Sequence, residues 1–328
     1  MLLKIIMKTK SVKTFLGIDV GSISTNLVLI DEKSEVLSCL YIRTEGNPIK
    51  AIQKGLRELK KETLSYDFNI EVSGVGATGS ARYLTGVIVG ADLVKNEITA
   101  HAKGASFFVP DVRTVIEIGG QDSKIIILEN GIAIDFGLNL ICSAGTGAFL
   151  DAQAFRLGVP IKEFGEIALK SNKPTHISGR CTVFSESDMI HKQQVGHSIE
   201  DIAAGLCQSL VRNYFSAVAK GKNIQPPIVF QGGVSENLGM RKAFEQELGQ
   251  KIIVPKYNTV AGAFGAALLV KEANLQQTKF LGFDISEKDI KCVSFQCSGC
   301  PNQCEVIEAK IDGETVSRWG DRCGKWST

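Results

Sequence analysis

The chain has 328 residues, with 37 Lys or Arg against 35 Asp or Glu, and a formal net charge of +2. Hydrophobic residues make up 44% of the sequence, which excludes a mainly disordered chain. The balanced charge and the 7% of aromatic residues do not favour a nucleic-acid-binding protein. No apolar stretch reaches the ~20 residues of a membrane span, and Lys4 interrupts the apolar start. We therefore expect a cytoplasmic protein without a membrane segment.

The first part of the chain is predicted to form a β-hairpin, a third strand, a helix, a fourth strand that ends before a Gly-rich segment, and a second helix. Their expected ranges are 14–30, 36–43, 48–64, 70–73 and 92–107. The helix at 48–64 has the clearest start, because Asn47 can cap it and Pro48 suits its first position.

The second part of the chain repeats this plan. Its expected strands are 114–118, 123–128, 132–136, 228–231 and 251–254, and its expected helices lie within 147–220 and at 260–271. Both parts run β-turn-β-β followed by helices, which predicts a duplicated α/β architecture with a cleft between two lobes. The expected domains are lobe I at 13–108, completed by a helix at 258–275, lobe II at 109–257, and a separate tail at 276–328.

Three Gly-rich turns follow predicted strands. They contain Asp19, Gly21, Ser22, Ser24 and Thr25; Glu117, Gly119, Gly120, Gln121 and Asp122; and Gly232 and Gly233. Glycine lets backbone N–H groups approach phosphate oxygens, and a carboxylate at a strand end can hold Mg²⁺ or orient water. Neither a Gly-x-x-x-x-Gly-Lys-Ser/Thr motif nor a Gly-x-Gly-x-x-Gly between strand and helix is present, so a P-loop and a dinucleotide site are disfavoured.

The three turns, in this order, resemble those of the actin-like, sugar-kinase and heat-shock-chaperone ATPase superfamily. The resemblance implies two ribonuclease-H-like domains that bind ATP or ADP with Mg²⁺. It implies that Asp19 lies near Mg²⁺, that Glu117 helps to activate water, and that Gln121 is catalytic. The implied nucleotide-binding residues are Gly21, Ser22, Ser24, Thr25, Gly119, Gly120, Asp122, Gly145, Gly147, Gly232 and Gly233.

Cys142 and Cys181 each lie directly before a predicted helix. The N-terminus of a helix carries partial positive charge and free N–H groups, which stabilise a thiolate or an anionic cluster. Two thiolates provide half of the ligands of a four-iron cluster, and a twofold-symmetric homodimer would supply the other half. The pair therefore predicts one [4Fe–4S] cluster shared between two chains.

The segments that begin at Cys142 and Cys181 resemble the activator component of 2-hydroxyacyl-CoA dehydratases and are similar to the ATPase subunits of benzoyl-CoA reductase. The resemblance implies a homodimer in which ATP hydrolysis drives a low-potential electron into an iron–sulfur dehydratase or reductase. It also implies an upstream ferredoxin or flavodoxin as electron donor. Two alternatives are a small-molecule, sugar-type kinase of the same superfamily and a non-enzymatic, ATP-gated scaffold.

The tail contains five of the nine cysteines: Cys292, Cys297, Cys300, Cys304 and Cys323. This spacing predicts a second [4Fe–4S] cluster, which we favour slightly, or a zinc site. The expected ligands are Cys297, Cys300, Cys304 and Cys323, with Cys292 as the spare. A hairpin is expected around Asp312 and Gly313. Cys39 and Cys207 stand in apolar surroundings, and we expect both to be buried core residues.

Overall fold

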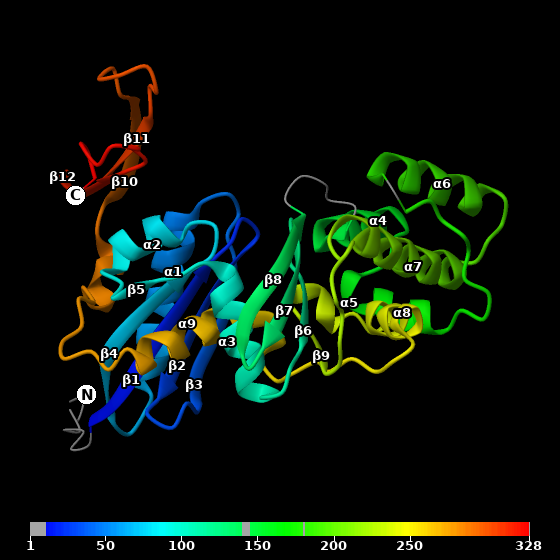
Figure 1. Ribbon diagram of the computed structural model, residues 1–328, viewed down its shortest axis with the longest axis horizontal. Helices are drawn as coiled ribbons and strands as arrows, with labels where there is room; N and C mark the ends of the chain where they lie inside the picture. Colours follow the sequence, from blue (N-terminus) through cyan, green and yellow to red (C-terminus); the bar gives the residue numbers. More distant parts are fainter. Residues whose placement is uncertain (1–10, 140–144, 180, 328) are drawn as a thin grey trace, which may run out of the picture. The chain divides into compact units, whose positions relative to one another are not determined.

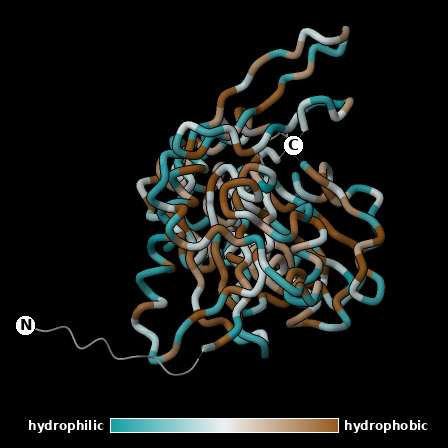
Figure 2. The backbone as a smooth tube through the Cα atoms, turned by 90° about the vertical axis from the view of Figure 1, so that its left-hand side faces the viewer, coloured by the Kyte–Doolittle hydropathy of each residue, from teal (hydrophilic) through white to brown (hydrophobic). Residues whose placement is uncertain are grey.

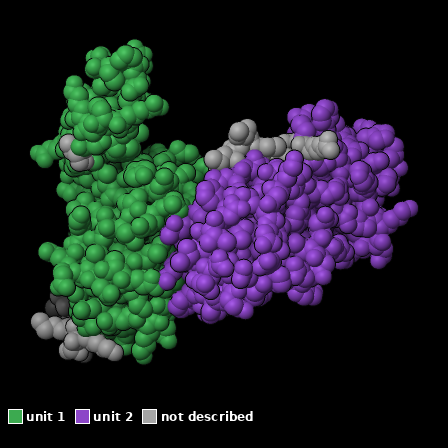
Figure 3. Space-filling model, in the orientation of Figure 1, with its two compact units in different colours: residues 1–97, 262–328 green, residues 98–261 purple. Residues whose placement is uncertain are grey.

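The computed structural model describes residues 11–139, 145–179 and 181–327 (Figure 1). The chain forms two compact units, which are residues 1–97 with 262–328 (unit 1) and residues 98–261 (unit 2; Figure 3). Hydrophobic and hydrophilic segments alternate along the backbone (Figure 2). None of the helices in the described ranges combines the length and the apolar character that a membrane crossing requires.

Unit 1 contains a five-stranded sheet in the order β3-β2-β1-β4-β5. Its strands are β1 (Ser11–Val20), β2 (Ser24–Asp31), β3 (Val36–Arg43), β4 (Asn69–Thr78) and β5 (Leu93–Val94). β2 pairs antiparallel with β1 and β3, whereas β4 runs parallel to β1 and β5 parallel to β4. Residues 27–30 of β2 are all buried, which is typical of a strand covered on both faces. The predicted hairpin and third strand are confirmed.

Three helices belong to this sheet: α1 (Pro48–Leu64), α2 (Arg82–Val89) and α9 (Ala261–Glu272). α1 begins as predicted, with Pro48 in its first turn and the Asn47 side chain accepting a hydrogen bond from Lys50 N. α2 lies where no helix was expected from the sequence.

Small residues let α9 pack directly on β1 and β4. A Cβ on Gly17 would lie 1.8 Å from Ala263 O, and a Cβ on Gly76 would lie 2.4 Å from Ala266 O. Gly76 therefore serves a helix–sheet contact within β4, which continues to Thr78. The prediction that this strand ends at residue 73 was wrong, because its glycines make room for a helix.

Unit 2 contains a four-stranded sheet in the order β8-β7-β6-β9. Its strands are β6 (Thr114–Ile118), β7 (Ser123–Glu129), β8 (Ile132–Asn139) and β9 (Ile228–Gln231). β6, β7 and β8 form an antiparallel meander, and β9 is parallel to β6. The first four strands of unit 1 have the same arrangement, so the predicted duplicated α/β architecture is confirmed. The strand expected at 251–254 was wrong, because only an isolated bridge joins Ile253 to Val229.

The helices of unit 2 are α3 (Glu97–Phe108), α4 (Gly147–Arg156), α5 (Ile161–Leu169), α6 (Thr182–Gln194), α7 (Ile199–Ala217) and α8 (Leu238–Leu248), with short 3-10 turns η2 (Gly233–Glu236) and η3 (Asn258–Val260). Asn237 caps α8 by accepting a hydrogen bond from Met240 N. Aromatic contacts fill the core, because the ring of Phe244 lies 5.3 Å from that of Tyr214 and 5.1 Å from that of Phe230.

The tail contains η4 (Phe283–Glu287) and a three-stranded antiparallel sheet of β10 (Ile290–Gln296), β11 (Glu305–Ile311) and β12 (Glu314–Trp319). The predicted hairpin at Asp312 and Gly313 is confirmed. The start of the tail packs on α1, where Gln53 Nε2 donates to Lys288 O (2.8 Å) and Arg57 donates to Ser286 O (2.8 Å).

The compact units differ from the predicted domain limits at two places. Ala102 and Ala105 of α3 pack against buried residues of β6, β7 and β9, so the helix belongs to unit 2 rather than to the first lobe. Ile285 and Ile290 of the tail enter the core of unit 1, so the tail is anchored there rather than separate.

Candidate functional site

In unit 2, a buried carboxylate lies beside two glycine turns. Glu117 occupies the end of β6 and is 4% exposed. A Cβ on Gly119 would lie 3.4 Å from Glu117 Oε1, and a Cβ on Gly232 would lie 2.7 Å from the same atom. Glycine is thus required at residue 232 on two grounds, since its φ of +88° is also in the left-handed region. The second and third predicted turns meet at this carboxylate.

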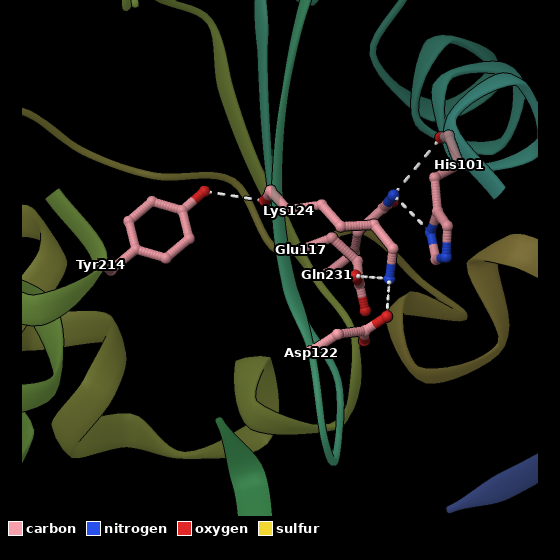
Figure 4. Close-up of polar contacts among 6 residues, drawn as sticks. All are labelled: His101, Glu117, Asp122, Lys124, Tyr214 and Gln231. Atoms are coloured by element: carbon pink, nitrogen blue, oxygen red, sulfur yellow. Dashed lines mark hydrogen bonds and ion pairs between the residues drawn. The ribbon is translucent and has the colours of Figure 1, made fainter. Parts of the chain in front are cut away.

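The opposite side of Glu117 contacts a lysine that the sequence analysis missed. Lys124 of β7 pairs with Glu117 in the strand register. Its Nζ lies 3.0 Å from Glu117 Oε2 and 2.9 Å from Asp122 Oδ2 (Figure 4). Lys124 is almost fully buried, and its main-chain carbonyl accepts a hydrogen bond of 2.8 Å from the Tyr214 hydroxyl. The signal for Lys124 in the sequence is its position opposite Glu117 across the hairpin of β6 and β7.

The turn after β6 is held by the N-terminus of α4. Gly147 N donates to Gly119 O (2.9 Å), and Ala148 N donates to Gly120 O (2.8 Å). Three predicted nucleotide-binding glycines, Gly119, Gly120 and Gly147, are therefore neighbours. Gln121 is exposed on the same turn.

Gly145 precedes Gly147 by two residues. A Cβ on Gly145 would be 3.0 Å from Asn213 Oδ1 and 3.7 Å from Ser123 Oγ. Both of these oxygens are buried, and neither has a hydrogen-bond partner among the described residues. The structure thus places Gly145 beside two buried polar atoms.

The turn after β9 is fixed by main-chain and side-chain contacts within unit 2. Gly232 N donates to Asn258 O (2.9 Å), and Ser235 Oγ donates to Gly232 O (2.7 Å). Gln231 Nε2 lies 2.9 Å from His101 Nδ1 of α3 (Figure 4). These contacts hold the turn without using the side of Gly232 that faces Glu117.

Unit 1 repeats the arrangement at Asp19, which is 9% exposed near the end of β1. A Cβ on Gly79 would lie 2.6 Å from Asp19 Oδ1, and Gly79 has a φ of +94°. The cross-strand neighbours differ from those of Glu117, because Asp19 pairs in register with Asn26 and Thr78. Asn26 Oδ1 and Thr78 Oγ1 are buried and have no hydrogen-bond partner among the described residues.

The predicted hydroxyl residues of the first turn have different surroundings. Ser22 is exposed and Ser24 is half-buried, whereas Thr25 is fully buried and shares a hydrogen bond of 3.0 Å with Thr44. The backbone closes the turn, because Gly21 N donates to Ser24 O (2.9 Å). Thr25 therefore holds the turn internally in this structure.

Of the two cysteines predicted to share a cluster, Cys142 lies outside the described residues. Cys181 is the N-cap residue of α6, is half-buried, and caps the helix with no side-chain hydrogen bond. Its position at a helix N-terminus is as predicted. A half-exposed thiol at such a position fits an anionic cluster.

Exposed apolar side chains surround this part of unit 2. Val183 and Phe184, directly after Cys181, are 68% and 66% exposed. Phe155 of α4 is 86% exposed, and the ion pair of 2.9 Å between Arg156 and Glu186 places α4 beside α6. Large apolar side chains exposed on neighbouring helices are typical of a protein–protein interface.

Three of the tail cysteines, Cys297, Cys300 and Cys304, belong to the loop between β10 and β11. Cys297 N donates to Cys304 O (2.8 Å), which closes the loop that contains Cys300. Hydrogen bonds from Gly299 N–H and from the Trp326 indole hold the pKa of the Cys297 thiol below its ordinary value.

The arrangement of the tail does not form a ligand shell. Within residues 11–139, 145–179 and 181–327, no three His, Cys, Asp or Glu side chains are placed to hold a metal ion. Cys323 is exposed and lies near Asp321, and Cys292 is half-buried on β10 opposite Ala309. The predicted ligand set of the tail therefore stays a prediction.

The two cysteines expected in the core differ. Cys207 of α7 is 1% exposed, as predicted. The prediction for Cys39 was wrong, because Cys39 is exposed on β3. The apolar neighbours of Cys39 in sequence belong to the other face of an edge strand.

Comparison with known proteins shows which proteins this chain is similar to. The model of the BadF/BadG/BcrA/BcrD ATPase family matches residues 16–270. The (R)-2-hydroxyglutaryl-CoA dehydratase activating ATPase of Acidaminococcus fermentans is 38% identical over 259 residues, which are 77% of this chain and 95% of that protein. The family match ends before the five tail cysteines.

Two solved structures have the same fold. The activator of the 2-hydroxyisocaproyl-CoA dehydratase from Clostridium difficile with bound ADPNP has a TM-score of 0.73 and 34% identity, covering 79% of this chain and 95% of its own. Component A of the Acidaminococcus fermentans (R)-2-hydroxyglutaryl-CoA dehydratase has a TM-score of 0.73 and 35% identity, covering 79% and 98%.

Proposed function

This chain belongs to the BadF/BadG/BcrA/BcrD ATPase family, and on that basis we propose that it is an ATP-dependent iron–sulfur reductase. The protein acts as a homodimer with one [4Fe–4S] cluster between its subunits. With ATP hydrolysis, it delivers a low-potential electron to an iron–sulfur dehydratase or reductase, such as a 2-hydroxyacyl-CoA dehydratase. A ferredoxin or flavodoxin supplies the electron. ATP is needed because raising one electron by 100 mV costs about 2.3 kcal/mol.

The observation that carries the ATPase part is the carboxylate beside a left-handed glycine, which occurs in both units. Asp19 lies against Gly79 and Glu117 lies against Gly232, with 2.6 and 2.7 Å from a glycine Cβ position to the carboxylate oxygen. A bare glycine lets a ligand and its water approach each carboxylate closely. We assign the nucleotide to the glycine turns next to these two residues.

The surroundings of the two carboxylates support different roles. Asp19 is flanked by the buried polar atoms Asn26 Oδ1 and Thr78 Oγ1, which lack partners among the described residues. Oxygen atoms that lack donors suit Mg²⁺ and its bound water, so these residues fit the metal. Glu117 already contacts the ammonium group of Lys124 and is assigned to orient the attacking water.

The cluster is assigned to Cys142 and Cys181 of each subunit. When bound, it supplies one-electron transfer at low potential. Cys181 offers a half-exposed thiol at the N-terminus of α6, and the apolar face of Phe155, Val183 and Phe184 beside it supports the burial of this region against a second copy.

The test is the iron and sulfide content of protein purified without oxygen. We expect about four irons per dimer in the wild type, and loss of this iron in Cys142→Ala and in Cys181→Ala. Nucleotide binding should persist in both variants. Cys39→Ala is the matched control, since Cys39 is exposed in unit 1. Iron retained in both variants, or a colourless wild type that phosphorylates a sugar, would reject the proposal.

For the tail, we propose that Cys297, Cys300, Cys304 and Cys323 bind a second [4Fe–4S] cluster or zinc. The support is the closed loop and the N–H donors around Cys297. The described side chains do not by themselves form a metal site. Metal content of Cys297→Ser, compared with Cys39→Ser, tests the assignment. Equal iron and zinc in both variants would remove it.

A further inference from the structure

The buried lysine of unit 2 has no role in the function proposed above. Lys124 lies in β7 next to the buried residues 125–127, a position where an apolar side chain would be expected. Burying an ammonium group is costly unless it is paired and hydrogen-bonded. Its Nζ contacts one oxygen of Glu117 and one of Asp122, at 3.0 and 2.9 Å (Figure 4). The lysine is therefore placed for these two carboxylates.

The two carboxylates would interact strongly without the lysine. Because both oxygens lie within 3.0 Å of one nitrogen, they are at most about 6 Å apart. The side chain of Glu117 is 6% exposed and that of Asp122 is 32% exposed. Two negative charges this close repel each other, and the repulsion is stronger where water is largely excluded.

Glu117 is bound on one side and faces the glycine turns on the other. Its Oε2 contacts Lys124, whereas its Oε1 faces the Cβ positions of Gly119 and Gly232. A carboxylate that accepts a proton from water must be ionised and held in one orientation. An ion pair at the far oxygen provides both.

We propose that Lys124 is a positioning residue for ATP hydrolysis, which keeps Glu117 ionised and fixes its carboxylate toward the glycine turns. This inference rests on the assignment of Glu117 as the residue that activates water. Lys124 contacts neither the nucleotide nor the water in this role and acts only through Glu117.

Three other described residues of unit 2 lie near Glu117 or Lys124. Gln231 of β9 is uncharged, and its amide contacts His101 of α3. Tyr214 of α7 donates to the main chain of Lys124, and burial together with the charge of Glu117 holds the pKa of Tyr214 well above its ordinary value. Asp122 adds a like charge from the turn, which the lysine offsets.

The experiment is the pH dependence of ATP hydrolysis by the full-length protein, measured as phosphate release at saturating ATP. In Lys124→Met, we expect kcat to fall and the acid limb of the profile to move up by about one to three pH units. KM for ATP should change less than kcat. Lys124→Arg should return the limb toward the wild-type position, because it restores the positive charge. Lys222→Met is the matched control, since Lys222 pairs with the exposed Asp135 in the same unit.

A second variant keeps the inference testable if Lys124→Met does not fold. In Asp122→Asn, Glu117 has the lysine to itself, so the acid limb should move to lower pH. Parallel profiles for Lys124→Met and wild type, or an unmoved limb in Asp122→Asn, would overturn the inference. Full kcat in Glu117→Gln would instead reject the role of Glu117, and with it the proposed hydrolysis site.

Discussion

Gly232→Ala tests whether the glycine turn next to Glu117 is required. An added Cβ would lie 2.4 Å from Ile118 O and 2.7 Å from Glu117 Oε1, whereas ordinary contacts begin at 3.4 Å. With a φ of +88° and a ψ of +168°, residue 232 has a backbone conformation that is nearly restricted to glycine and costs an L-residue about 1–3 kcal/mol. The backbone oxygen of Ile118 must also move by about 1 Å, and such overpacking adds about 1–3 kcal/mol. Displacement of Glu117 should lower ATP turnover as well.

Gly249→Ala provides the matched control for this substitution. Gly249 has a φ of +66° in the same unit, and nothing lies within 4 Å of its Cβ position. The control therefore carries only the backbone cost of about 1–2 kcal/mol. Urea unfolding and ATP hydrolysis of both full-length variants give the comparison. We expect Gly232→Ala to unfold at lower urea and to lose turnover, while Gly249→Ala keeps it. Equal midpoints with full turnover in both would refute the reasoning.

Three further predictions concern other parts of the chain. Burial raises the pKa of the Cys207 thiol to about 12, so iodoacetamide should modify exposed Cys39 and spare Cys207 until urea unfolds the protein; mass mapping that finds both modified at equal rates would contradict this. A hydrogen bond from Ser171 holds the pKa of Asp201 below 3.8. The wild type should therefore be more stable than Asp201→Asn above that pH, and this difference should disappear as the pH falls below it. An equal difference in unfolding temperature at about pH 3 and about pH 7 would exclude it. Phe184→Ser should weaken the proposed homodimer in gel filtration without lowering the unfolding temperature, because the side chain is 66% exposed; an unchanged elution volume argues against an interface at Phe184.

Local signals in the sequence were sufficient for much of the fold. The cap at Asn47, the strand at 36–43 and the turn at Asp312 depend on neighbouring residues, and all three were predicted. The end of β4 depends on a partner far along the chain, since Gly76 is there to admit Ala266 of α9. Glycine has the same appearance in sequence whether it makes a turn or leaves room for a helix.

The tail shows a similar limit. Its five cysteines are visible in the sequence, and their number favours a metal or cluster. The packing of Ile285 and Ile290 into the core of unit 1 is not visible, because it depends on α1 more than 200 residues earlier in the chain. The tail is thus attached to the fold through apolar contacts, and this attachment does not depend on its cysteines.

The chemistry of the two carboxylate sites depends on cross-strand register, which composition does not reveal. In both units, a carboxylate near the end of the first strand faces a left-handed glycine after the parallel strand, so the backbones are equivalent. The residues paired across the hairpin differ, since Asp19 has Asn26 and Glu117 has Lys124. A carboxylate with neutral partners attracts a cation, whereas one already paired with an ammonium group does not need one. Under the roles proposed above, this exchange of an amide for a lysine on a duplicated backbone distinguishes the metal-binding carboxylate from the proton-accepting one.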